Sequence, residues 1–197
     1  DTSGAADNVD ELPIALYGQQ AYCLSDRALE IIKKYESEGD KRISRTCIPE
    51  ISNGEVLHWW ANKFRGTKYS DDRVADSDMI VYRLSEMYLF KAEAYALLGD
   101  VTNALAYLNK VRNRAGISDY TQTDKQSVLK EILDERGREL FHEIKRFWDL
   151  RRADASGTID IYDYIPNLQG KTTPLYWAVH VNMMSLNDQL VQTEGYE

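Results

Sequence analysis

A helical pattern between Arg83 and Arg152 constrains this chain more than any other feature. Three segments within it, at residues 83–98, 103–115 and 128–152, place apolar side chains at intervals of three and four. That spacing gathers apolar side chains on one face of an α-helix. We therefore predict a mainly α-helical fold with two shorter helices, a long third helix, short strands and long irregular loops.

The first two predicted helices are joined by a short connection around Gly99 and Asp100. A connection this short makes neighbouring helices pack side by side in antiparallel directions. Small alanines along both helices let the two backbones approach closely, which is typical of a tetratricopeptide-like helix pair. The predicted contact faces hold Leu84, Tyr88, Ala92, Tyr95 and Ala96 on the first helix, and Ala104, Leu108, Val111 and Ala115 on the second.

The third predicted helix has a start signal of its own. Thr123 and Gln126 have the spacing of a capping box, in which each side chain satisfies a free backbone N–H of the first turn. Asp134 and Arg138 are four residues apart, which predicts an ion pair on the helix surface. The predicted apolar face holds Leu129, Ile132, Leu133, Leu140, Ile144, Phe147 and Trp148.

Four ordered motifs cover the same region. They are RLSE at 83–86 followed by AEA at 92–94, LNKVRNRAG at 108–116, ERGREL at 135–140 and KRFWDLRR at 145–152. In this order and spacing they resemble the SusD/RagB family. The triplet Asp40-Lys41-Arg42 and the closing pattern NDQLVQTEGY at 187–196 resemble further elements of that family. The segment Trp177-Ala178-Val179 departs from it, because the family commonly has Pro-Ile-Pro there.

The resemblance implies a surface-exposed lipoprotein of the bacterial outer membrane that binds a nutrient. The implied ligand is an oligo- or polysaccharide, or a peptide, which a SusC-like TonB-dependent transporter then receives. The implied function is binding without catalysis, and no cofactor is implied. We expect residues 1–24 to be a flexible or extended lead-in and residues 25–197 to match the carboxy-terminal domain of such a protein. We expect membrane contact only through a lipid anchor that this chain does not itself carry.

Two apolar runs at 43–51 and 55–64 flank Asn53-Gly54, which predicts a β-hairpin. Neighbouring side chains on a strand point to opposite faces, so at most one of Trp59 and Trp60 can fill a core. Exposed aromatic rings stack on the C–H faces of sugars, and we take Trp59, Trp60 and Tyr69 as candidate ligand-binding residues. Aromatic side chains also complete cores and interfaces, and that alternative stays open.

No arrangement of residues points to an enzyme. A glycosidase needs two carboxylates on opposite sides of the scissile bond. Glu135, Glu139 and Glu143 instead recur every four residues, which places them in one stripe on one helix, where we expect them to pair with arginines. His142-Glu143 starts like a zinc-protease helix, but Arg146 stands where the second histidine is required. We expect no catalytic residue and no metal site.

Charge and composition exclude further classes. The formal net charge of −8 disfavours a nucleic-acid partner, because phosphate binding needs clustered Lys and Arg. The acidic stretch at 70–78 is interpreted as a solvated loop in preference to a calcium site, because it lacks the ligand spacing of an EF-hand. A disulfide between Cys23 and Cys47 is left open. The alternative function is a helical-repeat interaction scaffold without a ligand site of its own.

Overall fold

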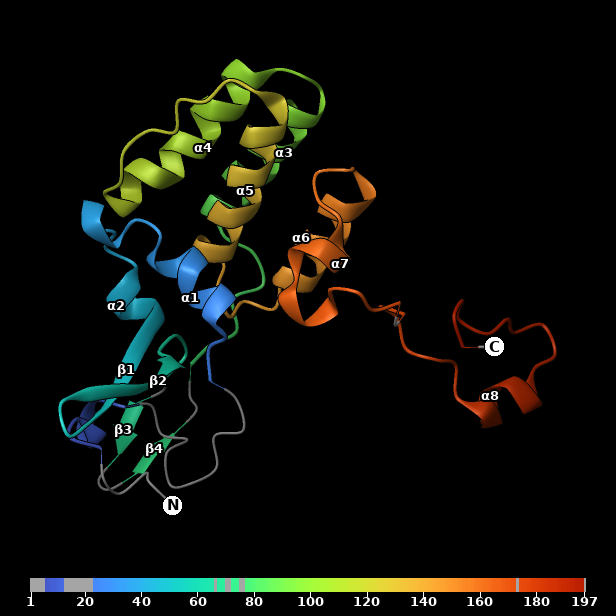
Figure 1. The fold of residues 1–197 in the computed structure, drawn as a ribbon, viewed down its shortest axis with the longest axis horizontal. Helices are drawn as coiled ribbons and strands as arrows, with labels where there is room; N and C mark the ends of the chain where they lie inside the picture. The colour runs from blue at the N-terminus through green and yellow to red at the C-terminus, as the bar shows by residue number, and fades with distance from the viewer. Residues whose placement is uncertain are drawn as a thin grey trace. The chain divides into compact units, whose positions relative to one another are not determined.

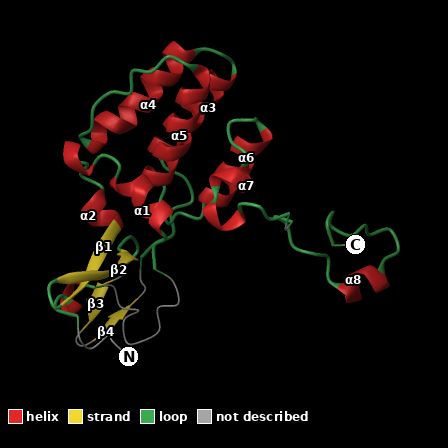
Figure 2. Ribbon diagram, in the orientation of Figure 1, coloured by secondary structure: helices red, strands yellow, loops and turns green. Residues whose placement is uncertain are grey.

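The structure, a computed structural model, describes residues 6–12, 23–65, 67–69, 72–74, 77–172 and 174–196. It divides into two compact units, Asp1–Thr158 and Ile159–Glu197, and each is described by itself. The fold is mainly α-helical, as predicted, with short strands in the first unit (Figures 1 and 2). The predicted boundary between a lead-in and a domain after residue 24 stays a prediction, because residues 13–22 lie outside the described ones.

The helices of the first unit follow one another along the chain, and the four described strands lie between α2 and α3 in sequence (Figure 1). Within the described residues, 3₁₀ turns precede and follow the first α-helix. The elements are η1 (Val9–Glu11), α1 (Asp26–Lys33), η3 (Glu36–Glu38), α2 (Ile43–Thr46), α3 (Leu84–Leu97), α4 (Val101–Ala115), α5 (Lys125–Glu139) and α6 (Arg146–Ala155). No helix within the described residues is long and apolar enough to cross a bilayer.

The predicted helix pair is confirmed as α3 and α4, which pack together with α5 around one apolar core. Its buried side chains are Leu89, Ala92, Ala96, Ala104, Leu108, Val111, Val128, Leu129 and Ile132. One predicted core residue is wrong, because Leu84 is 65% exposed at the start of α3 while Leu89 fills the contact with α4. Alanines on both helices leave space for the close approach of the backbones.

Short polar side chains start these helices. Ser25 accepts a hydrogen bond from the backbone N–H of Ala28 and caps α1. The cap of α5 is Asp124, which accepts from the backbone N–H of Ser127 at 2.8 Å. The predicted capping box, which begins one residue earlier, is therefore wrong. A carboxylate accepts a hydrogen bond at a helix start more strongly than a hydroxyl and also favours the positive end of the helix dipole.

The predicted long third helix is two helices, because the chain leaves the helical path after Glu139. His142 and Ile144 have positive φ angles of 62° and 61°. The carbonyl oxygen of Glu139, at the end of α5, accepts hydrogen bonds from the side chains of Arg83 and Lys63. Basic side chains that satisfy terminal carbonyls stabilise a helix end. Residues 140–145 contain no glycine or proline that would mark the end of the helix. The helix end depends instead on donors from distant segments.

The predicted hairpin is confirmed. Strands β1 (Cys47–Ser52) and β2 (Glu55–Ala61) pair antiparallel around a two-residue turn, in which Asn53 and Gly54 have φ angles of 51° and 77°. Positive φ at both positions is the conformation for which Asn-Gly is favoured. A second antiparallel pair joins β3 (Thr67–Tyr69) to β4 (Asp72–Val74), and β4 lies within the stretch at 70–78 that was interpreted as a loop. The rest of that stretch includes residues outside the described ones.

Residues 6–12 pack on the hairpin. The side chain of Asn8 donates to the carbonyl of Pro49 at 2.8 Å and accepts from the N–H of Ile51 at 3.0 Å. Leu12 is buried against Trp60. Cys23 is exposed and Cys47 is buried, and both are free thiols. Burial raises the pKa of the Cys47 thiol to about 11.

The second unit contains α7 (Ile161–Tyr164), η4 (Pro166–Leu168) and α8 (Val181–Leu186). Gln192 and Thr193 of the closing pattern form hydrogen bonds with the segment Trp177-Ala178-Val179, which departs from the family. The side-chain amide of Gln192 accepts from the N–H of Val179 at 2.7 Å and donates to its carbonyl at 3.1 Å. Thr193 Oγ1 donates to the carbonyl of Trp177 at 2.8 Å. These contacts hold the segment in place without the family's prolines.

Candidate functional site

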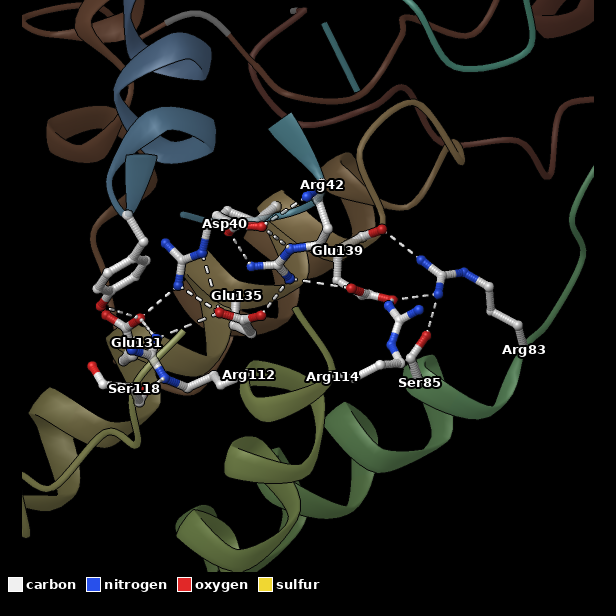
Figure 3. A network of polar contacts seen from close by, with 12 residues as sticks. Asp40, Arg42, Arg83, Ser85, Arg112, Arg114, Ser118, Glu131, Glu135 and Glu139 are labelled. Atoms are coloured by element: carbon white, nitrogen blue, oxygen red, sulfur yellow. Dashed lines mark hydrogen bonds and ion pairs between the residues drawn. The ribbon is translucent and has the colours of Figure 1, made fainter. Parts of the chain in front are cut away.

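A stripe of three buried glutamates runs along one face of α5. Glu131, Glu135 and Glu139 are four residues apart, which places their side chains one above another. Carboxylates removed from water require cationic partners. Figure 3 shows arginines from α4 and from the segments that precede α2 and α3 converging on this stripe. The predicted pairing of Glu135 and Glu139 with arginines is therefore confirmed. The placement of Glu143 on the same helix was wrong, because α5 ends at Glu139.

The part of this network around Glu131 joins α4 to α5. Arg112 Nη1 donates to Glu131 Oε1 at 2.8 Å, and Arg138 Nη2 donates to the same oxygen at 2.5 Å. Arg138 also donates to Glu135 Oε2 at 2.8 Å, and its side chain is only 1% exposed. The prediction of a surface pair was wrong for Arg138, because the buried carboxylates one turn and two turns earlier attract its guanidinium inward.

The triplet Asp40-Lys41-Arg42 supplies the next contacts. Arg42 Nη1 donates to Glu135 Oε1 at 2.6 Å and to Glu139 Oε2 at 3.1 Å. Its Nε and Nη2 donate to the two oxygens of Asp40 at 2.9 and 2.6 Å, a bidentate geometry. Burial works to lower the pKa of Arg42, but these carboxylates outweigh it and raise that pKa. One guanidinium thus connects the segment before α2 to two turns of α5.

Another part of the network surrounds Glu139, at the end of α5. Its carboxylate contacts Arg83, Arg114 and Arg42. Burial works to raise the pKa of Glu139, but the positive charges of these arginines outweigh it and lower the pKa to about 2. Beyond the end of α5, buried Glu143 pairs with Arg83 and Lys63. The cations around Glu131 and Glu139 outweigh the burial of these side chains and hold both as carboxylates.

A second buried group joins α3, α5 and α6. Arg136 Nη2 lies 2.7 Å from Asp149 Oδ1 and 3.7 Å from Glu86 Oε1. Arg152 Nη2 lies 2.8 Å from the same Asp149 oxygen and 3.0 Å from Glu93 Oε2. Together the two groups use charged residues from all four family-like motifs. The charged residues of these motifs therefore hold the helices in position.

The best-placed candidate residue of the aromatic hairpin is Trp59. It lines a pocket of about 470 Å³ together with Glu11, Glu36, Asp40 and Ser44. Lys33 Nζ lies 4.3 Å from the centre of the indole ring and 3.2 Å from Glu36 Oε2. The pocket thus brings an aromatic ring together with residues that carry hydrogen-bonding oxygen atoms. This combination is found in sites for small polar ligands.

Trp60 points to the opposite face of β2, as the alternation predicts. It is 7% exposed, and its Nε1–H donates to Glu50 Oε2 at 2.9 Å. The edge of its ring also contacts His58, with centroids 5.8 Å apart. The side chain of Tyr69 lies outside what the structure describes. The structure therefore places one candidate tryptophan at a pocket and the other in the packing beneath the hairpin.

Sequence reasoning missed the polar residues of this pocket. Glu36 and Asp40 precede α2 and Ser44 lies within it, between about fifteen and twenty-three residues before Trp59. The antiparallel pairing of β1 with β2 brings the two segments together. The only signal was the Asp40-Lys41-Arg42 triplet. Because Arg42 is fixed to α5, the triplet positions the wall of the pocket as well as joining the helices.

A larger hollow of about 510 Å³ lies between α1, α5 and α6, and its walls are mostly apolar. Phe147 and Trp148 line it, with ring centroids 5.1 Å apart, and Trp148 is 59% exposed. The sequence pattern had placed both rings on a buried face. They are exposed because the interruption after Glu139 turns α6 away from the direction of α5.

Comparison with known proteins identifies the family to which this region is similar. The model of the SusD family matches residues 13–196. The chain is 27% identical over 165 residues to the starch-binding protein SusD of Bacteroides thetaiotaomicron, covering 81% of this chain and 29% of that protein. It is 31% identical over 138 residues to the SusD-like protein P25 of Formosa agariphila, covering 64% and 24% of the two chains. The chain thus spans less than a third of the length of these relatives.

Solved structures are similar over nearly the whole chain. A SusD superfamily protein of Bacteroides fragilis superposes with a TM-score of 0.74 at 25% identity, covering 95% of this chain and 43% of that one. A SusD superfamily protein of Bacteroides vulgatus gives a TM-score of 0.69 at 19% identity, with coverage of 88% and 44%, and this second likeness concerns the fold alone.

Proposed function

Because this chain belongs to the SusD family, we propose that it binds a glycan on the outer surface of a bacterial cell without altering it chemically. The relative from Bacteroides thetaiotaomicron is named a starch-binding protein, which supports a carbohydrate as the ligand. We place the protein at the outer membrane as a lipoprotein, where it passes its ligand to a SusC-like TonB-dependent transporter.

The observation that carries this proposal is the pocket beside Trp59. An indole ring offers a flat apolar surface for the C–H face of a sugar, and carboxylate and hydroxyl oxygens accept hydrogen bonds from its hydroxyl groups. Ser44, Glu11 and Glu36 carry such oxygens and line the same pocket as Trp59. In this proposal Trp59 is the stacking residue, and Trp60, bonded to Glu50, supports the strand from the opposite face.

Calorimetry and affinity electrophoresis of the 197-residue chain against a panel of glycans test the proposal. Trp59→Ala should weaken binding about thirtyfold, since a central aromatic contact contributes about 2 kcal/mol. The matched control is Trp148→Ala, which removes another partly exposed tryptophan from the first unit, in the apolar hollow. This control should bind as tightly as the unmodified chain.

Two results would contradict the proposal. If no glycan binds, the helical-repeat scaffold becomes the better explanation of this fold. If Trp148→Ala abolishes binding and Trp59→Ala does not, the ligand site is not the pocket beside Trp59. The reducing ends of the glycan, counted before and after incubation, should not increase, because the proposed role is binding alone.

Delivery to a transporter needs a test in cells. Protease added to intact cells should digest the protein if it lies on the outer surface. Deletion of its gene should reduce uptake of the bound glycan, while the transporter itself remains in the membrane. Uptake that is unchanged by the deletion would argue against a role in delivery.

A further inference from the structure

The charge of the pocket beside Trp59 restricts the class of ligand that it can accept. Glu11, Glu36 and Asp40 contribute to its wall, while no Lys, Arg or His is among the described residues that line it. Among the described residues three cations lie close by, and each is already engaged. Arg65 donates to the backbone carbonyl of Glu11 at 2.9 Å. Lys33 is 3.2 Å from Glu36, and Arg42 binds Asp40 with two hydrogen bonds.

From this arrangement we infer that the pocket selects neutral glycans and disfavours those with carboxylate or sulfate groups. The inference rests on the proposed function and names the ligand class for the same site. Hydroxyl groups of a neutral sugar donate hydrogen bonds to carboxylates, which are strong acceptors. An anionic sugar would instead place its charge near Glu11 and Glu36 without a free arginine or lysine in the wall to pair with it.

Simple electrostatics set the size of the preference. Two like charges 4 Å apart repel by about 1 kcal/mol in bulk water and more strongly near a protein surface. One such contact therefore weakens binding of an anionic glycan about tenfold compared with its neutral counterpart. Salt screens exposed charges, so the difference should narrow as the ionic strength rises.

The experiment compares neutral and anionic polysaccharides on the full 197-residue chain. Starch, xylan and galactan are the neutral probes, and polygalacturonate and a sulfated galactan are the anionic ones. We expect binding of at least one neutral probe, with an affinity that changes less than twofold between 50 and about 500 mM NaCl because no ion pair is formed. The anionic probes should bind at least about tenfold more weakly at low salt.

A charge reversal tests the role of the pocket itself. Glu36→Lys should raise the affinity for the anionic probes about fivefold at low salt, and the gain should disappear at high salt. The matched control is Glu30→Lys, which changes the net charge equally at an exposed residue of α1 that pairs with Arg27. This control should leave the ranking of the probes unchanged.

The outcomes separate this inference from the proposal on which it rests. If the unmodified chain binds an anionic probe as tightly as any neutral one, the inference fails while glycan binding stands. An equal gain from Glu30→Lys would also overturn it, because the preference would then come from overall charge. If no probe of either class binds, the proposed function fails and the inference fails with it.

Discussion

Arg138→Met removes a buried cation that bridges two acids of the α5 stripe. The guanidinium donates to Glu131 at 2.5 Å and to Glu135 at 2.8 Å, and its side chain is 1% exposed. Methionine keeps most of the aliphatic volume and removes the charge. The variant therefore tests the electrostatic role of this arginine more than its packing.

The expected cost follows from the partners that remain. Removing one partner of a buried ion pair costs about 3–5 kcal/mol, because a charge is left without compensation. Glu131 keeps Arg112, and Glu135 keeps Arg42 at 2.6 Å, so we expect the lower limit, about 3 kcal/mol. For a protein of this size the melting temperature should fall by about 6–12 °C.

Differential scanning calorimetry measures this change, with Arg114→Met as the control. Arg114 also contacts the stripe, at Glu139, but its side chain is 61% exposed. An exposed pair contributes about 1 kcal/mol or less, so this control should melt within about 4 °C of the unmodified chain. Equal melting temperatures for the two variants would refute the reasoning, because burial would then make no difference to the ion pair.

The remaining predictions concern the dependence of stability on pH and substitutions at two glycines. Because the pKa of Glu139 is about 2 in the folded chain and near 4.5 when unfolded, this residue stabilises the fold by about 3 kcal/mol above pH 4.5. That contribution should be lost as the pH falls from 4.5 towards 2, and Glu139→Gln should make acid unfolding, followed by circular dichroism, less steep in this range. Gly195→Ala should speed hydrogen exchange at the amide of Val179, because its Cβ would lie 2.5 Å from Pro174 at a φ of +89°. Gly170 also has a positive φ, +70°, but no atom lies within 4 Å of the position that a Cβ would take. Gly170→Ala should therefore leave the amide of Val179 protected.

Helix positions were predictable where the signal is local. The apolar spacing of α3 and α4, the Asp100 turn and the Asn53-Gly54 hairpin all depend on residues within a few positions of one another. The break after Glu139 was not predictable, because its carbonyl is satisfied by Arg83 and Lys63 from distant segments. A spacing rule that assumes one continuous helix cannot include donors of this kind.

The candidate site was predictable only in part. Alternation along β2 separates Trp59 from Trp60, since neighbouring strand residues face opposite ways. Which of the two rings lines a pocket depends on the packing of residues 6–12 over Trp60 and of α2 beside Trp59. Those contacts join segments that no periodic pattern relates, so the polar half of the pocket was missed.

The sequence alone determined the helical class, the helix pair, the hairpin and the family, because each is specified by short-range spacing or by ordered motifs. Only the tertiary structure decided the role of the charged motifs. Glu135 and Arg138 read as surface charge in a linear pattern, yet they are buried together because acids on α5 and arginines from several segments neutralise one another. A charge is stable in the interior only when its partner is brought to it, and folding decides which partner that is.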